Sequence, residues 1–176
     1  TAVGTASMVT NTTGFGNTAL GKNSLYTNNG NNNTAVGHEA LELNTSGANN
    51  VAVGRQALEA NTTGGNNIGI GFIALSNNTT ASNNTAVGKS ALQENTSGAS
   101  NVAVGYLSLD ANTTGATNVA IGRGSLGANT TASNNVAVGD LALVANTTAD
   151  NNVAVGYNAL QSNTCLLYTS DAADEP

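Results

Sequence analysis

The sequence repeats itself at a nearly constant interval of 17 residues. Aligning it on the Gly that closes each Ala-Val-Gly-like triplet gives one column of ten residues: Gly4, Gly21, Gly37, Gly54, Gly71, Gly88, Gly105, Gly122, Gly139 and Gly156. Every step is 17 residues except the 16-residue step from Gly21 to Gly37. The missing residue falls in the Asn- and Gly-rich stretch 28–33, where a surface turn tolerates a deletion. A fixed period of this kind predicts a solenoid in which each repeat forms one coil.

Within a repeat, some columns hardly vary. Leu or Met stands four residues after the Gly, Ala or Ser three after, and Val, Ile or Leu one before. Asn stands four residues before the Gly and again seven after it. Stacked Asn amides can hydrogen-bond to each other and so satisfy a buried polar column, whereas stacked Asp would repel. We therefore expect a structural Asn ladder at the second position: Asn44, Asn61, Asn78, Asn95, Asn112, Asn129 and Asn146.

Short strands and turns alternate in each repeat. In a triplet such as 51–53, Val51 and Val53 point to one face and Ala52 to the other. We expect a second short strand at Ala57-Leu58, and turns at the Gly and at the Asn-Thr-Thr-Gly stretch. No 3.6-residue period supports a helix. The prediction is an all-β parallel β-roll or β-solenoid of about ten 17-residue coils over residues 1–164.

The alternating triplet also suggests which side chains are buried. We expect Val and Leu to fill the core of a thin roll, with the Ala column facing outward. A flat strip of small apolar side chains along a rod is an association surface, and we expect it to mediate a homotrimer. The alternative is a monomeric solenoid with Ala inside and Val outside.

Composition excludes several classes of function. Charged residues make up 8% of the chain and the formal net charge is −6, so a basic nucleic-acid-binding face is not expected. His38 is the only histidine, which leaves no His-based metal cluster or catalytic triad. Glu39, Glu42 and Glu59 are the only close carboxylates, and they stand in tolerant columns. We expect no enzymatic activity and no cofactor.

One column has the composition of a binding surface. The position directly after the Gly holds all four basic residues of the chain together with aromatic ones, and Thr5 and Asp140 complete it. Stacked on a solenoid, these side chains would form one longitudinal stripe that suits sugars or anionic polymers. The alternative is a solvated corner that accepts any residue. The candidate binding residues are Lys22, His38, Arg55, Phe72, Lys89, Tyr106, Arg123 and Tyr157.

The stretch Asn-Asn-Val-Ala-Val-Gly-x-x-Ala-Leu, as in 49–58 and 151–160, resembles the head repeats of YadA-like trimeric autotransporter adhesins. The longer form with Asn-Thr-Thr-Gly is similar to repeats in bacterial and phage tail-fibre proteins. The resemblance implies a left-handed, trimeric β-roll on a cell surface or a virion. It implies a partner that is a host glycan or matrix protein, without membrane insertion of this segment. The adhesin repeat is commonly shorter, so the extra residues here are expected to lengthen a turn.

Residues 165–176 follow no repeat rule. The segment contains the only Cys and the only Pro, Cys165 and Pro176. It resembles the translation of a sequencing adapter, and we expect it not to belong to the protein. Without it the repeat region carries a net charge of −3, because three of the ten acidic residues and none of the four basic ones lie there.

Three other functions compete with adhesion. An ice-binding solenoid would use the Thr columns at Thr62/Thr63 and Thr79/Thr80, although adjacent Thr residues point to opposite sides. A purely structural spacer would bind no ligand. A polysaccharide-cleaving β-helix would need an acidic cluster, which we do not expect in this chain.

Overall fold

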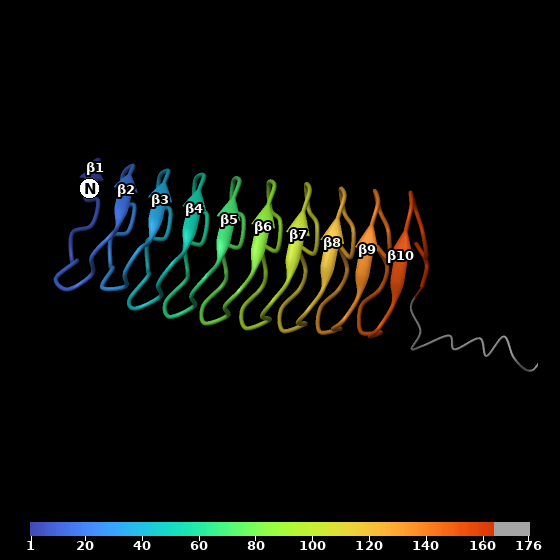
Figure 1. Ribbon diagram of the computed structural model, residues 1–176. Helices are drawn as coiled ribbons and strands as arrows, with labels where there is room; N and C mark the ends of the chain where they lie inside the picture. The colour runs from blue at the N-terminus through green and yellow to red at the C-terminus, as the bar shows by residue number, and fades with distance from the viewer. Residues whose placement is uncertain (164–176) are drawn as a thin grey trace, which may run out of the picture.

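The computed structural model describes residues 1–163, and these form a β-solenoid (Figure 1). Each repeat contributes one short strand to a single ten-stranded parallel sheet in which neighbours in sequence are neighbours in space. The strands are β1 (Ala2–Val3), β2 (Thr18–Leu20), β3 (Thr34–Val36), β4 (Val51–Val53), β5 (Ile68–Ile70), β6 (Thr85–Val87), β7 (Val102–Val104), β8 (Val119–Ile121), β9 (Val136–Val138) and β10 (Val153–Val155). The all-β repeat architecture predicted from the 17-residue period is confirmed.

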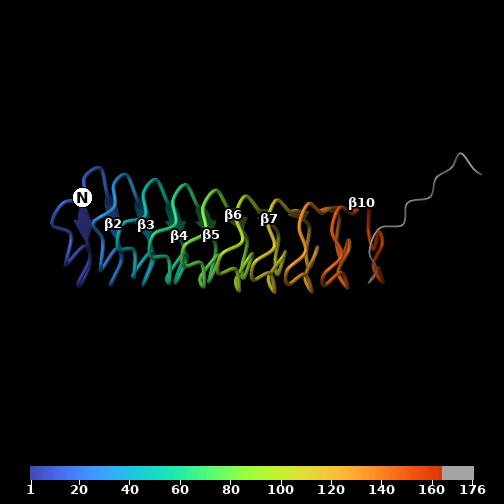
Figure 2. The ribbon, with the colours of Figure 1, turned by 90° about the horizontal axis from the view of Figure 1, so that it is seen from below.

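The strands stack in strict register, so each column of the sequence becomes a line along the rod (Figure 2). The register survives the short repeat, where Thr18 pairs with Thr34 across 16 residues. Asn29 fills the gap in that turn, since its side-chain Oδ1 accepts the backbone N–H of Thr12 at 2.9 Å and of Thr13 at 3.4 Å. In the longer repeats the backbone carbonyl of a Thr accepts the equivalent bonds. A side chain therefore replaces the deleted backbone.

The prediction that Val and Leu share the core and that Ala faces outward is wrong for the strand residues. Ala52 and its equivalents in β2 to β10 are buried, whereas Val51 and Val53 lie on the outer face and are partly exposed. The side chains of the hydrophobic core cluster come from three columns: the strand Ala, the Leu and the Ala that precedes it. The interior holds a Leu on one wall, and only a methyl group fits between it and the strand opposite. At Gly69, a Cβ would already lie 3.2 Å from Leu58 Cγ.

The second strand expected at Ala57-Leu58 is also absent; the segment is a turn. Leu58 has φ +54°, a left-handed conformation that a strand cannot contain. Its N–H still bonds to the next coil, donating to the carbonyl of Ala74 at 3.0 Å. Burial of the side chain and this bond offset the backbone strain, and together they return the chain toward the sheet.

Two Asn ladders fill the polar side of the interior. In the first, Asn61 Nδ2 donates to Asn44 Oδ1 of the preceding coil at 2.8 Å and to the carbonyl of Gly64 at 3.0 Å. In the second, Asn50 Nδ2 donates to the same Gly64 carbonyl at 2.9 Å, while its Oδ1 accepts the N–H of Asn67. One carbonyl in the coil thus accepts from both ladders. The Asn side chains are fully buried and hold neighbouring coils together.

Ile73 is poorly suited to its backbone conformation. It has φ +51° and is the one β-branched residue of its column, where the other repeats place Ala, Asn, Glu, Gln, Ser, Leu or Gly. A β-branched side chain is costly there, and Asn tolerates the conformation. We expect Ile73→Asn to raise the free energy of unfolding by about 1 kcal/mol, measured by chemical denaturation. Leu107→Asn is the control, since Leu107 has φ +54° without branching at Cβ. An equal gain in both variants would contradict the explanation.

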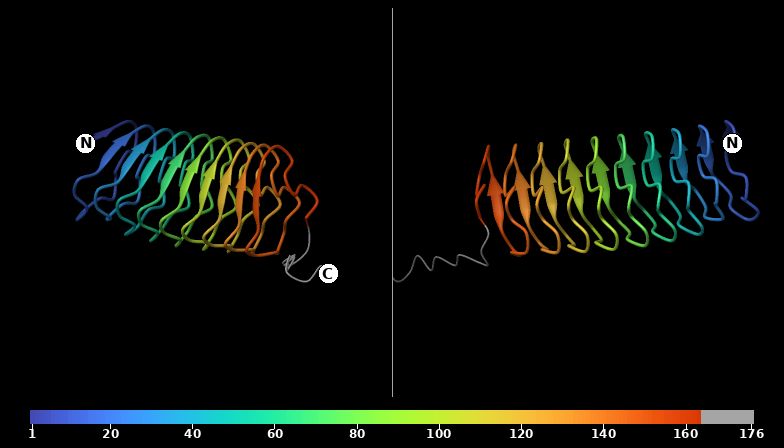
Figure 3. Two further views of the ribbon diagram at one scale, coloured as in Figure 1. Left: turned by 45° about the vertical axis from the view of Figure 1, so that its right-hand side comes forward. Right: turned by 180° about the vertical axis from the view of Figure 1, so that it is seen from behind.

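Residues 165–176, which we expect not to belong to the protein, lie outside the residues that the structure describes. Within residues 1–163, no helix is long and apolar enough to cross a membrane. The row of strands extends along the whole rod, with the coils stacked one after another (Figure 3).

Candidate functional site

The predicted stripe exists as a line of side chains that directly follows the strand ends. Each strand ends in a corner Gly, such as Gly71 with φ +139°, and the next residue projects from that corner. Phe72, Tyr106 and Tyr157 are 39%, 45% and 73% exposed. The cationic members Lys22, Arg55, Lys89 and Arg123 are exposed as well, and His38 is half-buried. The structure therefore brings all eight candidate residues onto one edge of the solenoid.

Members of the stripe contact each other from coil to coil. Arg55 Cζ lies 5.6 Å from the centroid of the Phe72 ring, and Lys89 Nζ lies 6.0 Å from it. Lys89 Nζ also lies 5.5 Å from the centroid of the Tyr106 ring. These distances are those of cation–π pairs. Because Arg55 and Lys89 come from the coils before and after Phe72, the ring separates two cations and offers little free face for stacking on a sugar.

Carboxylates accompany the stripe at two places. Arg123 pairs with Asp140 of the next coil, with Nε to Oδ1 and Nη2 to Oδ2 both at 3.1 Å. His38 Nδ1 lies 3.3 Å from Glu39 Oε2. The stretch from Arg55 to Tyr106 has neither contact. Arg55 and Lys89 consequently keep their N–H groups available for charge-assisted hydrogen bonds to an anionic ligand.

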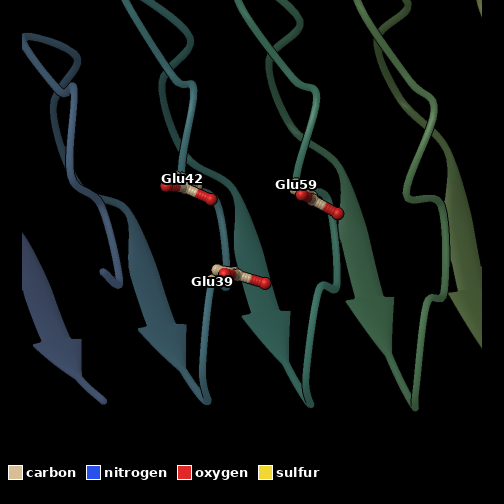
Figure 4. A group of neighbouring side chains, drawn as sticks. All are labelled: Glu39, Glu42 and Glu59. Carbon is tan, nitrogen blue, oxygen red and sulfur yellow. The ribbon is translucent and has the colours of Figure 1, made fainter. Parts of the chain in front are cut away.

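Glu39, Glu42 and Glu59 form an acidic cluster beside the stripe, on two neighbouring coils, which was not expected from the sequence (Figure 4). One carboxylate oxygen from each lies within 4.8 Å of the others. Among residues 1–163, these are the side chains that could hold a hard cation such as Ca²⁺. Burial raises the pKa of Glu59, and the negative charges of Glu39 and Glu42 raise it further. Burial and then Glu39 likewise raise the pKa of Glu42.

The raised pKa values predict that the cluster opposes folding at neutral pH. A carboxyl group with a higher pKa in the folded state favours folding when it is protonated, and this contribution is lost as pH rises through the folded-state pKa. We expect Glu59→Gln to raise the melting temperature at pH 7, by the equivalent of at most about 1 kcal/mol. The gain should vanish at a pH well below the ordinary carboxyl pKa.

Glu94→Gln is the control for this substitution, measured by the same thermal denaturation series. Glu94 lies outside the cluster and accepts a hydrogen bond from Asn77 Nδ2 at 2.8 Å. Its replacement should stabilise the chain less than Glu59→Gln at pH 7, because the charge of Glu94 repels Asp110 alone, whereas that of Glu59 repels both Glu39 and Glu42. A pH-independent gain in Glu59→Gln would show that packing, rather than charge, is responsible.

The Thr columns differ from a surface of free hydroxyl groups. The first Thr of the turn donates its hydroxyl to a carbonyl of the next coil, as Thr62 Oγ1 does to Thr79 at 2.9 Å. Thr45, Thr79, Thr96, Thr113 and Thr130 repeat this bond. Only the second column, which contains Thr63 and Thr80, is exposed without such a bond. The hydroxyl groups of the first column stabilise the turn.

The stripe has one property that was not predicted from the sequence, its alternation. The cations occupy every second coil, and an aromatic or imidazole ring lies between each successive pair. Read along the rod, the order is Lys22, His38, Arg55, Phe72, Lys89, Tyr106 and Arg123. The order was legible in the column itself, but only the cation–π contacts show that neighbouring members touch.

No family model, no curated protein and no solved structure matches the chain.

Proposed function

We propose that this chain is a segment of a self-associating surface fibre, an adhesin head or a tail-fibre shaft, with no catalytic role. It would work outside the cell, on a bacterial surface or, as the alternative, in a virion. The observation that carries the proposal is the outer face of the ten-stranded sheet. Two columns of Val, Ile, Leu and Thr point outward there along the full length of the rod, and neither contains a charged residue.

The exposure of this face supports self-association. Side chains such as Ile68, Ile70 and Ile121 are 37–39% exposed. A continuous exposed apolar surface of this kind indicates an interaction site. Parallel sheets are normally buried on both faces. A second copy of the same chain offers a surface of the same length and spacing, so the two can match coil by coil. The interface is therefore proposed on the Val/Ile face, not on the Ala column.

The resemblance of the repeat to YadA-like heads favours three copies around a common axis, in the left-handed form of the roll. Trimerisation would bury the Val/Ile face and leave the stripe of cations and rings on the outside. A stiff rod with a repeated, outward-facing column is suited to attachment to an extended host glycan or matrix protein. Self-association and ligand binding would then use different faces of the coil.

The test is the solution mass of the chain by multi-angle light scattering. The expected result is three times the 17.3 kDa of one chain. Val104→Lys, which places a charge in the outer column of β7, should give the monomer with an unchanged circular dichroism spectrum. Thr80→Lys, which adds the same charge on an exposed turn, should remain a trimer. A monomeric unmodified chain would contradict the proposal.

A further inference from the structure

The four cations of the stripe form an array with a fixed pitch. Successive members are two coils apart, at Lys22, Arg55, Lys89 and Arg123. Neighbouring parallel strands lie about 4.8 Å apart, so the cations repeat roughly every 9.6 Å. The strict register of the strands keeps this spacing along the rod. The chain has no other Lys or Arg, so all of its Lys and Arg side chains lie on this line.

The rings between the cations contact the cationic side chains and restrict their positions. Phe72 has a cation on each side, at 5.6 Å and 6.0 Å from its centroid, and Tyr106 has Lys89 at 5.5 Å. A ring between two like charges separates them and attracts both through its π face. It also restricts long side chains that would otherwise sample many rotamers, which lowers the entropy lost when a ligand binds.

We propose that this array binds an extended acidic polysaccharide that carries one anionic group per disaccharide. One sugar unit of an extended chain is comparable in length to one coil step, so every second sugar would meet a cation. Each anionic group would accept charge-assisted hydrogen bonds from a Lys or Arg. The inference rests on the proposed fibre function, whose exposed rod would present the array to such a polymer.

The pitch distinguishes this ligand from nucleic acid. A DNA strand carries one phosphate about every 3.4 Å, so the array would face only about one phosphate in three. The remaining phosphates would lie beside a chain whose formal net charge is −6. A sparsely charged polymer avoids this repulsion. Asp140, which pairs with Arg123, and Glu59, which lies on the coil of Arg55, further disfavour a densely charged ligand.

The test measures binding of a fluorescently labelled hyaluronan oligosaccharide, long enough to span Lys22 to Arg123, by polarisation at low salt. Lys89→Gln should weaken binding about fivefold, and Lys89→Arg should restore it. The double variant Lys89→Gln/Thr80→Lys keeps the net charge but moves it off the line, and it should bind as weakly as Lys89→Gln. Restored binding in the double variant would overturn the proposal.

A second variant should strengthen binding instead of weakening it. Asp140→Asn releases Arg123 from its ion pair and should tighten binding severalfold, although it removes a surface salt bridge from the folded chain. Unchanged or weaker binding would contradict a role for Arg123. Two further probes define the class of ligand. Neutral dextran should not bind, and a single-stranded DNA of equal length that binds as tightly as hyaluronan would overturn the assignment.

Light scattering of each variant separates this inference from the proposed function. Loss of binding with an unchanged mass places the defect in the stripe. A monomeric chain that still binds hyaluronan with the expected variant pattern would contradict the trimer alone.

Discussion

Replacing Gly88 by Ala should destabilise the solenoid by several kcal/mol, whereas the same replacement at Gly156 should cost much less. Gly88 has φ +137°, which L side chains rarely adopt, and a Cβ would lie 2.4 Å from the carbonyl oxygen of Gly105. Gly156 has φ +129°, but the nearest atom to its Cβ would be Ala159 Cβ at 3.9 Å. Backbone strain of about 1–3 kcal/mol applies to both. The steric clash between coils applies only to Gly88.

Thermal denaturation of the two variants would measure the difference, which we expect to exceed about 2 kcal/mol. Because the two positions share their backbone conformation, the difference measures the steric clash between the corner residues of successive coils. Hydrogen exchange should locate the damage of Gly88→Ala at the junction of β6 and β7, since each coil contacts only its neighbours. Equal losses in both variants would mean that strain alone makes Gly necessary at the corner.

Asn95→Asp should strongly destabilise the solenoid, although it replaces only one NH2 group by an oxygen. Asn95 Nδ2 donates to Asn78 Oδ1 at 3.0 Å and to the carbonyl of Gly98 at 2.9 Å. A carboxylate cannot donate either bond, and it places a negative charge against two acceptors in a fully buried site. We expect a loss of about 3–5 kcal/mol at pH 7. Part of it should be recovered in acid, where the protonated Asp can donate one bond.

Asn83→Asp provides the matched control for this substitution. Asn83 is exposed and has φ +64°, which Asp also tolerates, and its side chain makes no hydrogen bond to the described residues. Its replacement should change the free energy of unfolding by less than about 0.5 kcal/mol. A similar loss at both positions would show that charge in general, not the ladder, destabilises the chain. Chemical denaturation across a pH series gives both values.

The repeat period made the architecture predictable, because only stacked coils can bury an apolar column that returns every 17 residues. The invariance of the Asn column likewise indicated a buried ladder. The inner and outer faces of the strand were assigned incorrectly, since the alternation of Val51, Ala52 and Val53 defines two faces without saying which one is inside. The residue types that each column accepts indicate which face is inside. The outer columns accept Thr, Val, Ile or Leu, whereas the inner one accepts only Ala or Gly.

The second strand could not be excluded from the sequence. Ala57-Leu58 has ordinary strand composition, and the left-handed φ of Leu58 arises from closure of the coil, which local propensity does not report. The stripe was predictable as a column, but its contacts depend on the side-chain directions at the corner. The partners of Lys89 therefore required the structure.

The register of the coils also determines how such a rod can change in length. Apart from the short repeat, successive coils are joined by the same backbone and Asn-ladder bonds. A duplication that copies one whole repeat would join at both ends without any new side chain. A partial copy would misalign the Asn amides and the corner Gly residues, unless the loss falls in the turn, as it does beside Asn29. Lineages of this protein should therefore differ by whole repeats. The length of the rod and its number of cationic sites would then change in discrete steps.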